Sequence, residues 1–330
     1  MQYPTTGVPV SSGTTNFNTD GSDYIPVLYA QGTQVKYYDT SVLMEIANTK
    51  YEGLIKEKGN KVVIRTRPDI AIFDYSDNMD LEYEVPSSQS VELDIDRAKA
   101  YAFMVPKVEG HQSDIVLEDE FHADSARQME IAIDTEVLAE IPADAGLYNK
   151  GNTAGRISGD ILMGDIAVGQ KPRQGTASNC IDIVEDQRLV LTENTVPDDG
   201  NRWGVYPAWF CSLIRRNDIV KKANESGMAG ESLIFNNKFV SEVAGLNIFE
   251  SNLLSFVTVS DGANDHKVWS CPFGHEDGLT MAVQLTTAES VQLQNTFGRA
   301  YRGLYVYGFK VIKPQAFGRL YLSKDDFTVA

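Results

Sequence analysis

The side chains best suited to metal chemistry are two histidines and a cysteine in one short stretch, DHKVWSCPFGHEDG. His266, Cys271 and His275 could each bind zinc through a ring nitrogen or a thiolate. Structural zinc sites usually pair their ligands closely, as in CxxC, and need four of them, whereas Trp269 and Phe273 between these positions are typical core residues. The pattern favours a buried strand, and a metal-dependent enzyme is the alternative that these three residues would support.

A second set of candidate ligands lies in the acidic stretch PDIAIFDYSDNMDLEYEVPSSQ, residues 68–89. Met79 stands where an EF-hand loop needs Gly, and Val85 stands where it needs a bidentate Glu. The motifs GxSxG and HExxH are also absent from the sequence. We therefore expect no metal, no cofactor and no enzymatic activity. The residues that alternate like the early EF-hand ligands are Asp74, Ser76, Asn78, Asp80 and Glu82.

The same stretch is more informative as a contact surface. It holds six carboxylates and no Lys, Arg or His, together with more large apolar side chains than a protruding loop can leave in water. A solvated acidic loop is the alternative. The residues expected to contact a partner are Asp69, Ile72, Phe73, Asp74, Tyr75, Asp77, Met79, Asp80, Leu81, Glu82, Tyr83 and Glu84.

Two predicted strands flank this stretch and position it. In KVVIRTR, Val62, Ile64 and Thr66 share one face. SVELDID also has a period of two, because its apolar residues alternate with acidic ones. The connection between the strands exceeds 20 residues, whereas an ordinary hairpin loop has about two to five. We expect the two strands to pair, with the acidic stretch as a long extension of their hairpin.

One amphipathic helix is predicted before this hairpin in the sequence and another after it. Over residues 39–58, apolar residues recur every three or four positions, and Asp39 or Thr40 can cap the start. The second helix, over residues 118–141, stops before Pro142. Its apolar face comprises Ala126, Met129, Ile133, Val137 and Ile141.

Charge and cysteine content limit the classes of function. With 29 Lys and Arg against 46 Asp and Glu, the net charge is −17, which opposes binding of nucleic acid by broad phosphate neutralisation. The three cysteines are far apart and odd in number, so a disulfide framework is not expected. The sequence shows neither a secretory signal pattern nor a run of about 18 apolar residues. We expect a soluble protein made in the cytosol, without a membrane partner.

The order of these segments resembles that of tailed-bacteriophage major capsid proteins. The hairpin strands VVIRTRP and VELDIDRAKAYAFMV precede the long helix DSARQMEIAIDTEVLAEI, as in that family. Further along, DQRLVLTENTVPDDGNRWGVYPAWFCSLI is similar to the family's helix, acidic turn and buried strand, and FVSEVAGLNIFESNLL is similar to the strands that follow. GHEDGLTMAVQL resembles a late helix, and RAYRGLYVYGFKVIKPQAFGRLYL resembles a final strand that returns beside the long helix.

The resemblance covers roughly residues 39 to 330 and implies an α+β protein with the Hong Kong phage-type major capsid fold. In that fold the long hairpin is called the E-loop, the long helix is the spine of a peripheral domain, and an axial domain surrounds each capsomer axis. The implied divisions are an N-terminal arm at 1–38, an N-terminal helix at 39–59, the E-loop extension at 60–110, a peripheral domain at 111–175 with spine helix 118–141, the central axial domain at 176–288, and a peripheral return strand at 289–330.

The function implied by the resemblance is that of a major capsid protein. Such a protein assembles as hexamers and pentamers into an icosahedral head around packaged double-stranded DNA. The E-loop would then touch a neighbouring copy of the chain, with its carboxylates near basic groups. The candidates for these groups, for which a solvated surface is the alternative, are Arg215, Arg216, Lys221, Lys222, Arg299 and Arg302.

Departures from the family pattern bear on the implied partners. Residues 68–89 contain no Lys, so the crosslink that some members form through an E-loop Lys is not implied. The chain shows no long helical N-terminal extension, so a separate scaffolding protein is implied, together with a portal protein, while a decoration protein is left open. The implied location is the virion, after assembly in the bacterial host cytoplasm. An encapsulin-like compartment, which shares the fold and holds cargo enzymes, is the alternative within the same class.

Overall fold

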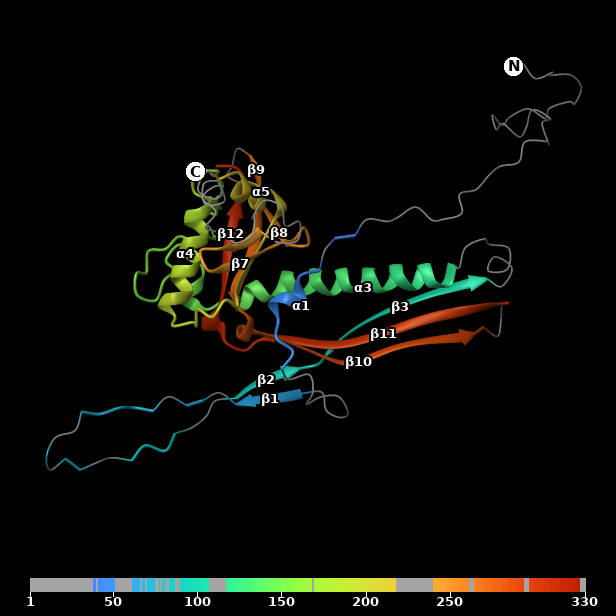
Figure 1. Ribbon diagram of the computed structural model, residues 1–330, viewed down its shortest axis with the longest axis horizontal. Helices are drawn as coiled ribbons and strands as arrows, with labels where there is room; N and C mark the ends of the chain where they lie inside the picture. Colours follow the sequence, from blue (N-terminus) through green and yellow to red (C-terminus); the bar gives the residue numbers. More distant parts are fainter. Residues whose placement is uncertain are drawn as a thin grey trace, which may run out of the picture.

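The computed structural model describes most of the chain between residues 38 and 326. The described residues form an elongated body with a rounded part at one end, and a thin extension leaves the body near that part (Figure 1). The described ranges are 38–39, 41–50, 61–65, 67–68, 70–74, 77, 79–80, 83–86, 90–106, 117–167, 169–217, 240–260, 264–293 and 297–326.

A long three-stranded antiparallel sheet forms the narrow part of the body. Its strand order is β10 (Leu279–Gln292), β11 (Gly298–Val311) and β3 (Arg97–Pro106). Strands β10 and β11 form a hairpin, and β3 runs antiparallel to β11. The 24-residue helix α3 (Leu117–Glu140) lies along this sheet (Figure 1).

The burial of α3 increases toward its C-terminal end. Ile133 and Val137 are buried, whereas Met129 is partly exposed and Ala126 is exposed. The helix ends two residues before Pro142, because proline disfavours the helical conformation in the residue that precedes it. The predicted helix and its end are confirmed, but its apolar face is buried only in the second half.

Charged and polar side chains fasten the buried half of α3 to the sheet. The Arg97 guanidinium on β3 forms hydrogen bonds of 2.6 and 2.7 Å with the Glu140 carboxylate and one of 2.6 Å with Glu136. Lys99 on β3 also pairs with Glu136, and the Tyr307 hydroxyl on β11 donates to it at 3.1 Å. Partial burial alone would raise the pKa of Glu136, but these three donors outweigh it and lower that pKa.

Aromatic side chains fasten the other half of α3 to the far end of the sheet. The His122 ring stands edge-on to Tyr301 of β11, with ring centroids 4.9 Å apart, and lies 5.1 Å from Phe103 of β3. Phe103 and Tyr301 stack on each other at 5.3 Å. This half of the helix therefore meets the sheet through a few rings, without the continuous core of the other half.

The rounded part contains a mixed seven-stranded sheet. Its strand order is β4, β12, β9, β5, β7 and β6, and β8 pairs with β9. None of the described helices is long and apolar enough to cross a membrane. The strands are β4 (Arg173–Gln174), β5 (Arg202–Tyr206), β6 (Val240–Val243), β7 (Leu246–Glu250), β8 (Phe256–Ser260), β9 (Asp265–His275) and β12 (Phe317–Ser323). The helices beside them are α4 (Cys180–Glu193) and α5 (Ala208–Arg216), and the 3-10 helices are η3 (Ile141–Asp144), η4 (Leu147–Asn149), η5 (Glu276–Gly278) and η6 (Pro314–Ala316).

The core of the rounded part is built around β5, whose five residues are all buried. The Trp203 and Phe317 rings meet with centroids 5.8 Å apart, and the Tyr206 and Phe210 rings meet at 5.2 Å. Parallel pairing with β7 and antiparallel pairing with β9 place β5 in the interior of the sheet. The predicted order of helix, acidic turn, buried strand and following strands is therefore confirmed in this region.

A two-stranded ladder carries the thin extension, which comprises residues 66–89. Strand β1 (Lys61–Arg65) pairs antiparallel with β2 (Ser90–Asp94), and Val62 stands opposite Leu93. Ile64 and Leu93 are buried against residues of the three-stranded sheet. The predicted pairing and its buried face are confirmed.

The predicted helix over residues 39–58 is wrong in its extent. Within the described part of that range, only α1 (Leu43–Ile46) is an α-helix, and residues 51–58 lie outside the described part. The chain becomes extended at Asn48, which forms a bridge with Thr280 of β10. Hydrogen bonds between the backbones of the two segments replace those of a further helical turn.

The start of α1 is also held differently from the prediction, which assigned the cap to Asp39 or Thr40. The Asp134 carboxylate of α3 accepts a 2.7 Å hydrogen bond from the N–H of Val42, the residue that precedes the helix. A side chain distant in the sequence thus does what a local cap would do.

The late helix predicted for GHEDGLTMAVQL is wrong. These residues pass from the end of β9 through η5 into β10, whose backbone pairs with β11. The helix was implied by the resemblance alone, and pairing with a distant strand decides the conformation here. The expected boundary between residues 288 and 289 consequently falls inside β10. The expected return strand over 289–330 is also divided, since β11 lies in the three-stranded sheet and β12 in the seven-stranded sheet.

We expect Arg97→Ala to weaken the attachment of α3 to the sheet. It removes the partner that Glu136 and Glu140 share and the guanidinium that lies 4.5 Å from the centroid of the Phe309 ring. Hydrogen bonds to charged groups contribute about 1.5 to 3 kcal/mol, and partial exposure reduces that value, so the free energy of unfolding in denaturant should fall by about 1 to 2 kcal/mol. Lys310→Ala, on the exposed side of β11, is the control. An equal loss in both variants would contradict this role of Arg97.

Candidate functional site

The extension exposes large apolar side chains to solvent. Ile72, Tyr83 and Val85 are 95%, 92% and 90% exposed. None of the described residues between β1 and β2 belongs to a helix or strand. A 3.2 Å hydrogen bond from the Ala71 N–H to the Glu84 carboxylate joins the two arms. Apolar surface presented in this way indicates a contact site for another molecule.

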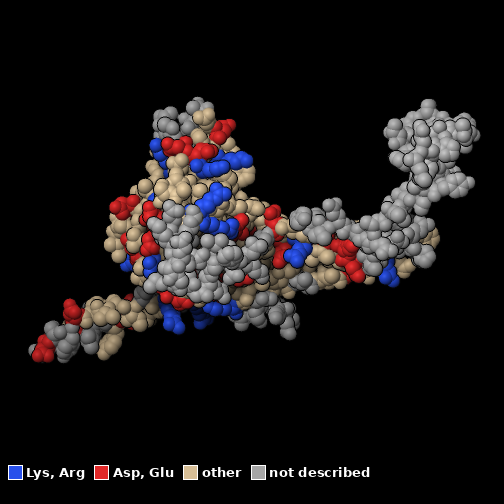
Figure 2. Space-filling model, turned by 45° about the horizontal axis from the view of Figure 1, so that its top comes forward, with Lys and Arg blue, Asp and Glu red and all other residues tan. Residues whose placement is uncertain are grey.

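The extension is also acidic. Figure 2 shows Asp and Glu atoms at its outer end and no Lys or Arg beside them on that face. Eight of the predicted contact residues are described and exposed: Ile72, Phe73, Asp74, Asp77, Met79, Asp80, Tyr83 and Glu84. The other four lie outside the described part of the chain: Asp69, Tyr75, Leu81 and Glu82.

The predicted basic partners lie on two separate elements. Arg299 and Arg302 are near the start of β11, and Arg215 and Arg216 are in the last turn of α5. Arg302 pairs with a carboxylate of β10 at 2.7 Å, and Arg215 pairs with one of β7 at 2.5 Å. Arg216 and Arg299 are exposed, and no carboxylate of the described residues pairs with either. The two remaining candidates, outside the described residues, are Lys221 and Lys222.

The extension and the start of β11 lie at opposite ends of the body. Figure 1 shows the extension leaving near the rounded part, whereas β11 begins at the far end of the three-stranded sheet. A contact between the extension and Arg299 therefore requires a second copy of the chain.

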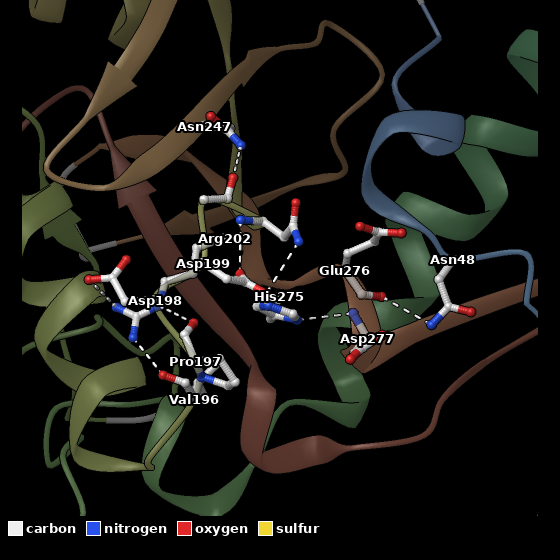
Figure 3. A network of polar contacts seen from close by, with 12 residues as sticks. Asn48, Val196, Pro197, Asp198, Asp199, Arg202, Asn247, His275, Glu276 and Asp277 are labelled. Carbon is white, nitrogen blue, oxygen red and sulfur yellow. Dashed lines mark hydrogen bonds and ion pairs between the residues drawn. The ribbon is translucent and has the colours of Figure 1, made fainter.

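A polar network joins the two larger sheets where β9 leads through η5 into β10 (Figure 3). The buried His275 ends β9, and its Nε2 lies 2.9 Å from the Asp199 carboxylate. Its Nδ1 accepts a 3.1 Å hydrogen bond from the Asp277 N–H. Because Nδ1 accepts, the proton of a neutral imidazole belongs on Nε2, which donates to Asp199. This hydrogen bond, together with one from the Asn201 N–H, lowers the pKa of Asp199.

Further contacts extend this network to the residues that follow α1. Lys50 pairs with the Asp277 carboxylate at 2.5 Å, and this hydrogen bond lowers the pKa of Asp277. The Asn48 amide donates to the Glu276 carbonyl at 3.5 Å. The start of β10 is thus held from two sides.

A buried arginine holds the acidic turn on the other side of the network (Figure 3). The Arg202 guanidinium donates to the backbone carbonyls of Val196 at 2.6 Å and Pro197 at 3.0 Å. Its burial lowers the pKa of Arg202, and the nearby Asp198 carboxylate acts in the opposite direction. The turn that carries Asp199 is therefore held in place by Arg202 as well as by the contact with His275.

The three zinc candidates do not converge. His266, Cys271 and His275 all lie on β9, and four residues along a strand span about 13 Å, so the last two cannot share one metal ion. Burial raises the pKa of the Cys271 thiol well above its usual value. In the described part of the chain, no group of three His, Cys, Asp or Glu side chains is placed to hold a metal ion.

Comparison with solved structures identifies the fold. A chain of Mycobacterium phage Che8 matches with a TM-score of 0.69 and 21% identity, over 91% of this chain and 97% of that chain. The capsid structure of cyanophage P-SCSP1u matches with a TM-score of 0.68 and 13% identity, over 95% and 96% of the two chains. The capsid of Ralstonia phage GP4 matches with a TM-score of 0.62 and 12% identity, over 95% and 98%.

These matches confirm the predicted α+β class and the likeness to the fold of tailed-phage major capsid proteins. At such identities they establish the fold alone. No protein-family model and no curated protein matches the sequence.

Sequence reasoning did not find the network around His275. A histidine followed by acidic residues after a strand is a signal for a capped turn, and η5 is such a turn. The carboxylate that accepts the hydrogen bond from its Nε2, however, lies 76 positions away in the sequence. Arg202 gave no signal either, since an arginine beside acidic residues usually belongs to the surface.

We expect Asp199→Asn to lower the stability of the protein at neutral pH and to make that stability less dependent on pH under acidic conditions. The pKa of Asp199 is lowered in the folded protein. Its contribution to stability is therefore present above about pH 4, the ordinary pKa of Asp, and is lost as the pH falls through the folded pKa. Differential scanning fluorimetry should give a lower Tm than wild type at pH 7 and a smaller drop between about pH 4 and pH 2. Asp160→Asn, in an exposed loop, is the control. Melting curves of the Asp199 variant that run parallel to wild type across this range would contradict the coupling.

Proposed function

We propose that this protein is the major capsid protein of a tailed bacteriophage, which assembles as hexamers and pentamers into an icosahedral head around double-stranded DNA. The observation that carries the proposal is the match of nearly the whole chain to nearly the whole of chains in phage capsid structures. The extension supports the proposal, because monomeric proteins rarely expose so many large apolar side chains together, and such a surface usually binds another molecule.

In the proposed shell, the extension acts as the E-loop and lies across a neighbouring subunit. Its apolar side chains supply most of the affinity, and its carboxylates set the register against basic groups of the neighbour. Arg216 and Arg299 suit this role best, since they are exposed and pair with no carboxylate of the described residues. Each subunit contacts several neighbours, and bonds after the first are effectively intramolecular.

The proposed partners follow from charge and assembly. A chain of net charge −17 encloses DNA without sequence-specific binding, because its carboxylates repel the phosphates. A separate scaffolding protein directs assembly in the bacterial host cytoplasm, a portal protein occupies one vertex, and a decoration protein can bind outside. The role is structural, with no enzymatic activity, and the mature location is the virion.

Negative-stain electron microscopy of the purified protein, expressed alone and with a neighbouring scaffold gene, tests this proposal. We expect closed shells, or hexamers and pentamers. A strictly monomeric protein at high concentration under both conditions would overturn it. Shells that hold cargo enzymes in place of DNA would support the encapsulin-like compartment instead.

We expect Ile72→Ala combined with Tyr83→Ala to reduce shell yield without unfolding the subunit. Both side chains are almost fully exposed in the subunit, so the fold does not depend on them. Each large apolar side chain buried in an interface contributes about 1.5 to 3 kcal/mol, so yield in microscopy should fall by about tenfold or more. Leu147→Ala with Ile157→Ala, at positions 75% and 80% exposed on the rounded part, is the matched control. Unchanged yield in the first double variant would show that the extension is not an interface.

Arg299→Glu tests the charge pairing. Because rim charges act mainly on association rate, we expect slower assembly in light scattering at low salt, by about two- to fivefold, with the difference vanishing at about 0.5 M salt. Lys310→Glu on the same strand changes the net charge equally and should leave the rate closer to wild type. If both variants behave alike, the effect is one of net charge and Arg299 has no specific partner.

A further inference from the structure

An open groove runs between α3, the three-stranded sheet and the residues around α1. Its volume is about 650 Å³, and its walls come from parts of the chain that are distant in sequence. Met44 of α1, Ala126 and Met129 of α3, Thr287 of β10 and Leu304 of β11 all line it. The groove is therefore a feature of the assembled fold that no single segment encodes.

The walls of the groove are apolar and reach the solvent. Met44 is 66% exposed, Leu304 is 38% exposed, and Ala126 is exposed as well. Ala126 and Met129 belong to the helical face whose spacing predicts a buried stripe. That stripe continues beyond the half of α3 that the core covers, which indicates a further segment that packs on it.

The chain reaches this groove from its N-terminal side. The Val42 N–H donates to the buried Asp134 carboxylate at 2.7 Å, and the Tyr38 hydroxyl donates to Asp124 at 2.5 Å. Ser41, between them, lines the groove. Since the ten residues of α-helix from Asp124 to Asp134 span about 15 Å, Tyr38 lies nearer to the start of α3 than Val42 does. The sequence before Tyr38 is thus attached directly beside the groove.

That preceding sequence contains an apolar run of suitable length. Residues 24–30, YIPVLYA, carry no charge, and Pro26 within them opposes a helix. Seven extended residues span about 23 Å, and the wall of α3 from Ala123 to Asp134 is about 16 Å long. The linker from residue 31 to Tyr38 reaches about 26 Å, so the run can lie in the groove of its own subunit.

We propose that residues 24–30 dock in this groove of the same subunit and cover the exposed face of α3. Ile25 and Leu28 are the side chains that would meet Ala126 and Met129. A short linker gives the run an effective concentration in the millimolar range, which favours its own groove over that of another copy. The docking concerns contacts within one subunit, and it is independent of the proposed function.

Disulfide trapping tests the position of the run. We expect Leu28→Cys with Ala126→Cys to form an intramolecular disulfide under mild oxidation, because the three native cysteines are buried and do not compete. Leu28→Cys with Ala132→Cys is the matched control, since Ala132 is an exposed alanine of the same helix that does not line the groove. The first pair should be trapped at least about fivefold more than the control, as expected from a docked, high effective concentration. Equal trapping in both pairs would overturn the docking. Trapping as a covalent dimer on a non-reducing gel would place the run in another copy and overturn the assignment to its own subunit.

Methionine oxidation gives a second readout with an internal control. Met44 lines the groove, whereas Met104, which is 48% exposed, does not. If the run covers the groove, hydrogen peroxide should oxidise Met44 more slowly than Met104, although Met44 is the more exposed of the two in the described residues. Ile25→Asp with Leu28→Asp should then raise oxidation of Met44 by about threefold or more and leave Met104 unchanged. An unchanged rate at Met44, measured by peptide mass spectrometry, would contradict the proposal.

Discussion

The attachment of α3 to the three-stranded sheet is the contact on which the rest of the structure depends. At one end of the helix, Ile133 and Val137 belong to the main core, and Arg97 bridges two carboxylates of the helix from β3. At the other end, the attachment consists of aromatic rings around His122. Because the strong contacts gather at one end, that end sets the position of the helix, and the other end is left with an open apolar groove. The body is elongated because the 24-residue α3 and the three-stranded sheet lie side by side along its length (Figure 1).

The same end of α3 lies close to the junction between the two larger sheets, and the junction is held in two ways. The main core continues across it, since Leu279 and Tyr307 belong to the same buried cluster as Trp203 and Phe273. The polar contacts around His275 constrain the orientation of the two sheets, because hydrogen bonds have a preferred geometry whereas apolar packing is largely non-directional. Close backbone approach adds a further constraint at Gly308, where a Cβ atom would lie 2.2 Å from the Asp94 carbonyl oxygen. The ladder that carries the extension therefore starts from a fixed base.

The exposed apolar and acidic extension is explained if the chain binds other copies of itself, as the proposed function requires. A net charge of −17 makes subunits repel one another at long range, so association needs apolar burial together with local pairing of opposite charges. The extension supplies apolar side chains and carboxylates near the rounded part, and Arg299 lies at the far end of the body. Contacts between different ends of neighbouring subunits are heterologous, and such contacts close into rings when the rotation between subunits permits it. The proposed ring-shaped capsomers require such contacts between the different ends of neighbouring subunits.

The sequence by itself determined the elements whose pattern is local. Alternation of apolar residues predicted the pairing of β1 with β2, and helical spacing and Pro142 predicted α3 with its end. The buried β5 was predicted from the resemblance of its stretch to the buried strand of the capsid family. The order of these elements was sufficient to predict the fold. Tertiary structure alone decided the conformation at Asn48, where pairing with β10 replaced a helical pattern, and over residues 274–285, where pairing with β11 replaced the helix that the resemblance implied. It also decided the partner of His275 and the groove beside α3. The physical reason is that periodicity reports which side chains favour burial, whereas the segment that buries them is chosen by the whole chain.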